Sequence, residues 1–280
     1  MVAIFGCTSR MEKSEHPTIL RVGVLPDESR EKLLQRYTPL FDYIAEEVSI
    51  SYEIVVPDNY DHLLELFHNK QVELAYFGGF TFVKAHTIDN AVPLVMRDVD
   101  TRFTSYFLVK ANNPLTKIAD FKGKTFTFGS DLSTSGHLMP RYFLKEMGIV
   151  PEDFFSKTGY SGKHDLTASQ VRDGKVDLGA ANHAVVNTMY QDGRLSKNEV
   201  RILWETPPYP DYVWALRSEI DKTLALKLRD AFLGLSLSDK KQSEILTNVN
   251  AGAFLPASAN DFSRLKVIVS ELGLLNQNAE

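Results

Sequence analysis

Alternation between two kinds of apolar pattern in the first eighty residues restricts the fold more than any other feature of the chain. Residues 19–25, 51–56 and 72–77 are short apolar runs that end at proline or glycine, which is typical of strands. Residues 37–48 and 60–68 carry apolar side chains at helical spacing. A strand–helix–strand–helix–strand order predicts a parallel sheet, because right-handed crossovers connect such strands.

The alternation begins again beyond an Asn-Asn-Pro loop at 112–114, which follows two further expected strands at 91–96 and 104–109. Strands are then expected at 124–128, 155–160, 176–180, 200–204 and 212–216, and helices at 136–147, 165–172 and 183–190. The last helical segments are expected at 222–233, 240–249 and 261–272. No sequence repeat accompanies this repeated architecture.

Two such units in series predict an α/β fold of two lobes, each a mostly parallel sheet flanked by helices, with a ligand cleft between them. We expect lobe 1 to comprise residues 19–108 and 209–280, and lobe 2, inserted into it, to comprise residues 109–208.

The charge balance indicates no nucleic-acid partner, because 36 acidic residues outnumber 31 basic ones and the net charge is −5. No apolar run reaches the roughly 18 residues that a membrane span needs.

Cys7 is the single cysteine of the 280 residues, so no disulfide can form within the chain. The apolar run at positions 2–6 resembles the tail of a bacterial lipoprotein signal, in which the following cysteine becomes lipidated. We therefore predict that Cys7 is lipidated and that residues 1–18 are a signal remnant and tether. A chance cysteine in a frayed terminus is the alternative.

Three adjacent hydroxyl residues, Ser133, Thr134 and Ser135, stand between a predicted strand and a predicted helix. The first turn of a helix leaves backbone N–H groups without partners, and the helix dipole favours negative charge there. One hydroxyl would be enough for a cap. Three hydroxyls followed by Gly136 predict an oxyanion cradle, with a capped helix in a serine-rich loop as the alternative.

Other chemistries fit the residues poorly. The Gly-Lys-Thr at 123–125 lacks the glycine that a phosphate-binding loop requires at position 118, which is Ile118. No Gly-x-Ser-x-Gly elbow surrounds a serine of the hydroxyl run, so we expect no catalysis. His62 and His68 are six residues apart, which does not place them on one helical face, and we expect no metal and no cofactor.

The chain resembles the phosphonate- and phosphite-binding proteins of bacterial ABC importers, the PhnD-like family. The resemblance extends from about residue 20 to 272, and its motifs are residues 56–60 (VPDNY), 70–78 (KQVELAYFG), 126–129 (FTFG), 133–140 (STSGHLMP), 162–165 (GKHD) and 174–182 (GKVDLGAAN). It implies a two-lobed periplasmic-binding-protein fold of type II that closes on its ligand by a hinge.

The resemblance also implies which side chains bind the ligand. In such proteins the hydroxyls and amides of the Ser-Thr-Ser run hold the oxyanion. The further matching positions are Tyr60, His164 and Asp211. The strand-end pair Tyr76 and Phe77 lies where α/β sheets place ligands, and it supplies candidates for an apolar wall of the site.

Three departures from the family's aminoethylphosphonate binders indicate a ligand without an amine. Those binders tend to have Trp-Tyr at the strand end, a second tyrosine where this chain has Phe103, and a glutamate near 182–185, where it has no acid. A buried ammonium without carboxylates is costly. We therefore expect phosphite first, then methylphosphonate; a larger phosphonate such as aminoethylphosphonate is the alternative.

The resemblance implies a non-catalytic, monomeric receptor on the periplasmic or extracytoplasmic face that delivers its ligand to an ABC permease. The lipidation predicted at Cys7 would tether it to the membrane. A module that senses a phosphorus oxyanion for a signalling partner is the alternative in another functional class. Asp211 would repel an oxyanion unless a proton lies between them, so we expect binding of a monoanion.

Overall fold

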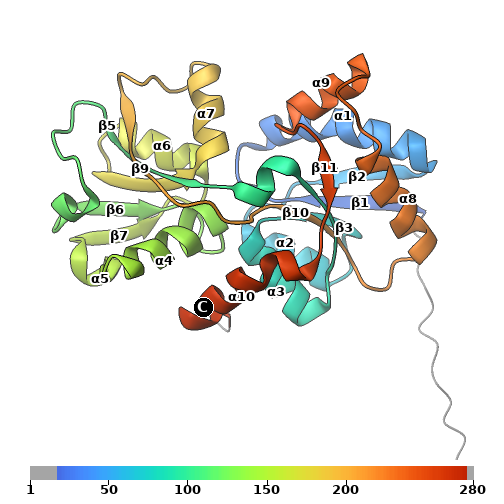
Figure 1. The fold of residues 1–280 in the computed structure, drawn as a ribbon, viewed down its shortest axis with the longest axis horizontal. Helices are drawn as coiled ribbons and strands as arrows, with labels where there is room; N and C mark the ends of the chain where they lie inside the picture. Colours follow the sequence, from blue (N-terminus) through green and yellow to red (C-terminus); the bar gives the residue numbers. More distant parts are fainter. Residues whose placement is uncertain (1–17, 276–280) are drawn as a thin grey trace, which may run out of the picture.

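The computed structural model describes residues 18–275, in which two sheets lie side by side and helices cover each of them (Figure 1). The lobe 1 sheet has the order β11-β4-β10-β3-β1-β2. Its strands are β1 (Ile19–Val24), β2 (Ser51–Val55), β3 (Leu74–Phe77), β4 (Val92–Arg97), β10 (Val213–Leu216) and β11 (Phe254–Pro256). The lobe 2 sheet has the order β7-β6-β8-β5-β9. Its strands are β5 (Ser105–Lys110), β6 (Thr125–Phe128), β7 (Lys157–Tyr160), β8 (Leu178–Asn182) and β9 (Val200–Glu205).

The two-lobed α/β fold is confirmed, but both sheets are mixed. Strands joined by helical crossovers are parallel: β1 pairs in parallel with β2 and β3, and β6 with β7 and β8. In contrast, β5 is antiparallel to β8 and β9, and β10 is antiparallel to β3 and β4. The chain enters β5 from lobe 1 and enters β10 from lobe 2. No right-handed crossover within one sheet therefore imposes a parallel direction on these two strands.

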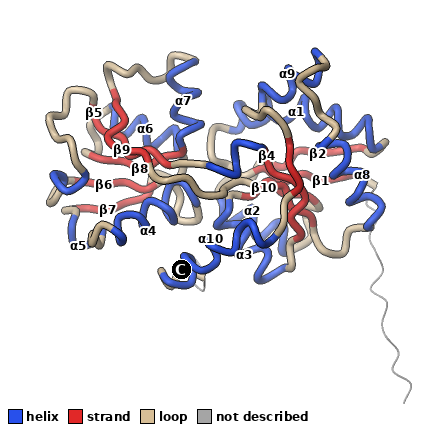
Figure 2. The backbone as a smooth tube through the Cα atoms, in the orientation of Figure 1, coloured by secondary structure: helices blue, strands red, loops and turns tan. Residues whose placement is uncertain are grey.

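Two chain segments connect the lobes, at residues 98–104 and 206–212 (Figure 2). They pair with each other, since the amide of Phe103 donates to the carbonyl of Tyr209 at 2.8 Å and the reverse bond measures 2.9 Å. The predicted division between residues 108 and 109 lies inside β5, all of which belongs to the lobe 2 sheet. The chain therefore enters lobe 2 before β5.

The helices of lobe 1 are α1 (Arg30–Val48), α2 (Tyr60–His68), α3 (Gly79–Asp89), α8 (Lys222–Leu233), α9 (Lys240–Asn248) and α10 (Ser263–Glu271). Those of lobe 2 are α4 (Met139–Glu146), α5 (Pro151–Phe154), α6 (His164–Arg172) and α7 (His183–Gln191). Helix α3 was not predicted. Its first seven residues, Gly79 to Ala85, are all buried, so its sequence lacks the polar face that produces a helical pattern.

Aromatic rings form the centre of each lobe. In lobe 1, the ring of Trp214 on β10 lies 5.1 Å from Phe41 and 4.7 Å from Tyr76, measured between centroids. In lobe 2, the ring of Phe126 on β6 lies 4.6 Å from Phe128 and 4.7 Å from Phe155. Buried aromatic rings contribute a large apolar area, and they pair favourably both edge-on and in offset stacks.

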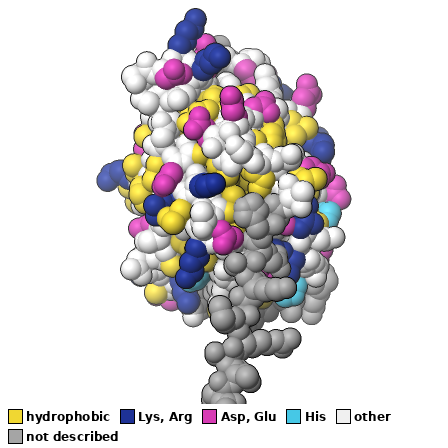
Figure 3. Space-filling view, turned by 90° about the vertical axis from the view of Figure 1, so that its right-hand side faces the viewer, with side chains coloured by type: hydrophobic (Ala, Val, Ile, Leu, Met, Phe, Trp, Pro, Cys, Tyr) yellow, Lys and Arg dark blue, Asp and Glu magenta, His cyan; other side chains and the backbone are white. Residues whose placement is uncertain are grey.

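The face of lobe 1 that points away from lobe 2 carries acidic and basic side chains that are interspersed with each other and with apolar atoms (Figure 3). Within residues 18–275, no helix is both long and apolar enough to span a membrane. The predicted lipidation site Cys7 and tether residues 1–17 lie outside the described residues.

Replacing Phe126 with alanine tests the lobe 2 core. Because the ring is 1% exposed and packs beside three other rings, Phe126→Ala should lower the free energy of unfolding by about 3–5 kcal/mol. Urea unfolding followed by fluorescence measures this. Leu226→Ala is the control: Leu226 is 49% exposed, and its loss should change stability by no more than about 0.5 kcal/mol. Equal effects of the two substitutions would contradict the packing described here.

Candidate functional site

Four helical segments begin at the interface between the lobes. Tyr60 is the first residue of α2, Gly79 of α3, Thr134 of a π-helical turn (Thr134–Leu138) that leads into α4, and His164 of α6. The amide of Phe80, the second residue of α3, donates to Thr134 Oγ1 at 3.0 Å, so the lobes touch here. Helix N-termini carry partial positive charge, and their convergence favours an anion without requiring a lysine or arginine.

The three predicted hydroxyls lie together at this point, and all are buried. Ser133 Oγ accepts from the amide of Gly136 at 2.9 Å, and Thr134 Oγ1 accepts from Phe80. As acceptors in these bonds, both hydroxyls keep their own hydrogens for donation. Ser135 Oγ has no hydrogen-bond partner among the described residues. The run therefore caps a helical turn, as the alternative interpretation predicted, and it also presents hydroxyl donors. The oxyanion cradle stays a prediction.

His164 presents one fixed ring nitrogen to this cluster. Its Nδ1 lies 3.2 Å from the backbone amide of Asn182, which can only donate, so Nδ1 accepts. The proton of the neutral ring must then sit on Nε2, which lies 3.4 Å from Ser133 Oγ. Burial lowers the pKa of His164 to about 3, so the ring stays neutral across the physiological range. His164 is thus a neutral donor aimed at the hydroxyl run.

Asp211 comes to the site on the return segment between the lobes. Its Oδ1 accepts from the amide of Gly79 at 2.9 Å, whereas Oδ2 completes no hydrogen bond of good geometry among the described residues, although the hydroxyls of Thr134 and Ser135 lie close enough to lower the pKa of the carboxyl. Burial raises the pKa of Asp211 to about 7, against the smaller lowering effect of the Gly79 amide. Burial likewise raises the pKa of Tyr60 well above its ordinary value, so the phenol keeps its proton.

Four buried side-chain oxygens within residues 18–275 lack a hydrogen-bond partner, and all four belong to predicted site residues. They are Tyr60 Oη, Tyr76 Oη, Ser135 Oγ and Asp211 Oδ2. A buried polar group without a partner costs about 1–3 kcal/mol, and native proteins rarely leave one unsatisfied. A bound group with several oxygens would supply partners to those oxygens that face it.

The strand-end pair Tyr76 and Phe77 divides between two faces of the sheet, as successive residues of a strand must. The ring of Tyr76 stacks on that of Tyr212 at 5.0 Å, on the side that meets lobe 2. The ring of Phe77 lies 5.2 Å from Phe67 of α2, inside the lobe 1 core. The structure therefore gives Phe77 a packing role and does not place it in the site. Phe103 packs beside Tyr212, with ring centroids 5.4 Å apart.

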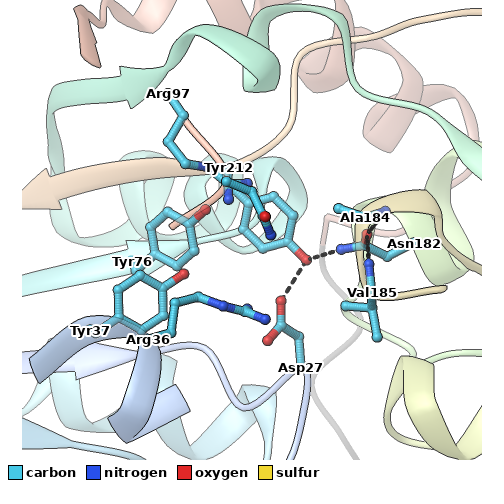
Figure 4. A pocket seen from close by; sticks show the side chains of 10 residues that line it. Asp27, Arg36, Tyr37, Tyr76, Arg97, Asn182, Ala184, Val185 and Tyr212 are labelled. Atoms are coloured by element: carbon cyan, nitrogen blue, oxygen red, sulfur yellow. Dashed lines mark hydrogen bonds between the residues drawn. The ribbon is translucent and has the colours of Figure 1, made fainter. Parts of the chain in front are cut away.

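Asp27, Asn182 and Tyr212 join the site, although no sequence pattern selected them as ligand-binding residues (Figure 4). The hydroxyl of Tyr212 donates to Asp27 Oδ2 at 2.7 Å and accepts from Asn182 Nδ2 at 2.8 Å. The carbonyl of Asp27 also accepts from the amide of His164 at 3.3 Å. Asp27 lies three residues beyond the end of β1, so the rule that placed Tyr76 at the carboxyl end of a parallel strand could have found it.

Ion pairs also hold the lobes together beside the site. Glu28 is fully buried and pairs with Arg36 of its own lobe and with Arg194 of lobe 2, the latter at 3.3 Å. Lys32 of α1 lies 3.5 Å from Asp192 of lobe 2. The described arrangement is therefore a closed one, in which both lobes surround the site. Within residues 18–275 no three His, Cys, Asp or Glu side chains group as metal ligands would.

Comparison with known proteins identifies the family. The model of a family described as "ABC transporter, phosphonate, periplasmic substrate-binding protein" matches residues 22–262. The chain belongs to this family. Its members are substrate-binding receptors of ABC importers, which places the chain on the extracytoplasmic side of the membrane.

Individual relatives agree with this assignment. The probable ABC transporter phosphite binding protein PhnD1 of Prochlorococcus marinus is 30% identical over 269 residues, covering 92% of this chain and 91% of that protein. A structure of PhnD1 in complex with methylphosphonate matches with a TM-score of 0.86 and 29% identity, over 92% of this chain and all of that one. The phosphate-import protein PhnD of Mycolicibacterium smegmatis is 27% identical over 230 residues, 77% of this chain and 71% of that protein.

Gly136→Ala tests the packing of the hydroxyl run against His164. An added Cβ would lie 2.9 Å from His164 Cε1 and 3.0 Å from Ser133 Oγ, so both donors must shift. With methylphosphonate as the probe, titration calorimetry should show affinity reduced about tenfold or more. Gly159→Ala on β7 is the matched control, because its Cβ would meet nothing within 4 Å. Undiminished affinity in Gly136→Ala would exclude this geometry.

Proposed function

We propose that the chain is the receptor of an ABC importer that binds a small reduced-phosphorus oxyanion, phosphite first and then methylphosphonate, between its lobes. The observation that carries the proposal is the set of partnerless buried oxygens of Tyr60, Ser135 and Asp211 beside the hydroxyls of Ser133 and Thr134. A tetrahedral oxyanion offers several acceptors to such a set of donors. The resemblance to a phosphite-binding protein that also binds methylphosphonate supports this choice.

The protonation of Asp211 determines which ionic form binds. Burial keeps its carboxyl neutral below pH 7, so the carboxyl can share a proton with an anion beside Oδ2. Above that pH, an ionised carboxylate without a cation beside it would repel the ligand. The site therefore suits an oxyanion that retains one proton between itself and Asp211.

Discrimination against phosphate rests on the aromatic side of the site. The rings of Tyr76, Phe103 and Tyr212 lie together there. The P–H of phosphite or the methyl of methylphosphonate needs no hydrogen bond against such rings. The fourth oxygen of phosphate would lose its water and stay unpaired, which costs about 1–3 kcal/mol.

A panel of ligands tests the proposed function. Titration calorimetry with phosphite, methylphosphonate, aminoethylphosphonate, phosphate and sulfate should show the tightest binding for phosphite. Phosphate should bind about tenfold to a hundredfold more weakly, because of its unpaired oxygen. Binding of phosphate as tight as that of phosphite would indicate a phosphate receptor instead, and no binding of either reduced compound would refute the proposal.

The pH dependence of affinity tests the role of Asp211. Because its pKa is raised to about 7, phosphite affinity should fall as pH rises from 6 to 9, by at most about tenfold per pH unit for one proton. Asp211→Asn should make this dependence shallower, since the amide does not titrate. Asp58→Asn is the control, because that side chain is 95% exposed. The same pH dependence in Asp211→Asn as in the native protein would count against a shared proton.

The remaining assignments follow from the family. We propose that the receptor acts as a monomer and passes its ligand to an ABC permease in the membrane. Lipidation at Cys7 would tether it there and stays a prediction. Mass spectrometry of the protein from bacterial membranes would detect the lipid.

A further inference from the structure

Tyr209 lies on the return segment between the lobes, and its place there is fixed. It stands between Pro208 and Pro210, and a residue before proline is restricted to extended backbone. Its backbone pairs with Phe103 of the other crossing segment in both directions, at 2.8 and 2.9 Å. Its side chain is buried, and the phenol oxygen lies 2.5 Å from Oγ of Ser105, the first residue of β5. The phenol therefore links the crossing segments to the lobe 2 sheet.

The hydroxyl of Ser105 meets a carbonyl that the helical turn cannot satisfy. In the π-helical turn, the carbonyl of Ser135 would accept from the residue five positions on, which is Pro140 and has no N–H. The amide of Met139 already donates to the carbonyl of Thr134, so the described turn leaves no amide for Ser135. Ser105 Oγ donates to this carbonyl instead, at 2.7 Å.

The hydrogens of these contacts have one possible direction. A backbone carbonyl only accepts, and a serine hydroxyl has a single hydrogen. Because Ser105 gives its hydrogen to the carbonyl of Ser135, the hydroxyl of Tyr209 must donate to Ser105. Burial raises the pKa of Tyr209 well above its ordinary value, so the phenol keeps the hydrogen that it donates.

The peptide unit between Ser135 and Gly136 extends this chain of hydrogen bonds to Ser133. A peptide unit is planar, so its carbonyl and its N–H are held together. The Gly136 amide donates to Ser133 Oγ at 2.9 Å. Nε2 of His164, which carries the proton of the neutral ring, lies 3.4 Å from the same oxygen. Because both lone pairs of Ser133 Oγ face donors, its own hydrogen points away from them and toward the proposed oxyanion site.

We propose that Tyr209 is a positioning residue for the oxyanion site, which orients the Ser133 hydroxyl as a donor to the anion. The chain of hydrogen bonds runs in one direction, from Tyr209 through Ser105 and the peptide unit to Ser133. Each donor in such a chain is polarised by the one before it, which strengthens the last bond. The inference rests on the proposed function, because it assumes that a phosphorus oxyanion binds at the hydroxyl run.

Removing the phenol hydroxyl tests the chain at its start. Titration calorimetry with methylphosphonate should show affinity reduced about threefold to tenfold in Tyr209→Phe, because the Ser133 hydroxyl loses part of its orientation and polarisation. Tyr190→Phe is the matched control. It removes a phenol hydroxyl that donates to the carbonyl of Val200 at 2.9 Å within lobe 2, and it should bind methylphosphonate as tightly as native protein does.

Two double variants decide whether Tyr209 acts through Ser133. Ser133→Ala removes the end of the chain, so adding Tyr209→Phe to it should change affinity by less than about twofold. Thr134 provides the contrast, because its hydroxyl accepts from the amide of Phe80 and lies outside the chain. Adding Tyr209→Phe to Thr134→Ala should therefore still weaken binding by about threefold to tenfold. For variants that bind too weakly for calorimetry, the thermal shift in millimolar methylphosphonate supplies the comparison.

The outcomes distinguish the inference from the proposed function. Native protein that binds neither phosphite nor methylphosphonate refutes the proposed function. Native protein that binds either compound, together with a folded Tyr209→Phe that binds as tightly as Tyr190→Phe, refutes the inference alone. An equal loss from Tyr209→Phe in the Ser133→Ala and Thr134→Ala backgrounds makes the role of Tyr209 a purely structural one and also refutes the inference. If thermal melting shows that Tyr209→Phe is unfolded, Ser105→Ala replaces it in both cycles with the same expected coupling.

Discussion

The proposed anion site is made of neutral donors, and this is the constraint on which the rest of the structure depends. The serine and threonine hydroxyls, the neutral imidazole of His164 and the starts of several helices all present partial positive charge to one point. Without an anion, buried oxygens of Tyr60, Ser135 and Asp211 stay unpaired. If an anion binds there as we propose, the groups that destabilise the empty closed form would stabilise the occupied one and couple binding to closure.

The two segments that connect the lobes place this site at the interface between them, so the site is complete only when the lobes are closed. The two crossing segments pair through Phe103 and Tyr209, and Asp211 follows within the same return segment. Donors from both lobes contact each other directly, as in the bond from Phe80 to Thr134. A ligand bound to one lobe alone would meet only part of the donor set, so complete recognition requires both.

Much of the architecture could be predicted, because periodicity reports which faces are buried. Helix α2 begins and ends at the predicted residues, and the parallel strands of lobe 1 follow from the strand–helix alternation. Helix α3 was not predicted from the sequence, because it is buried on all sides over its first two turns. The antiparallel direction of β5 and β10 was not predicted either, because pairing between segments far apart in the chain leaves no local pattern in the sequence.

The sequence by itself was enough to select the proposed oxyanion donors, because Ser133, Thr134 and Ser135 are neighbours in the chain and a helix start requires no distant partner to attract an anion. Tertiary structure decided which aromatic and acidic groups accompany them. Phe77 lies in the core, whereas Tyr212 meets Asp27 across a separation of 185 residues. Such contacts depend on how two sheets are docked, and no periodicity within either segment records that docking.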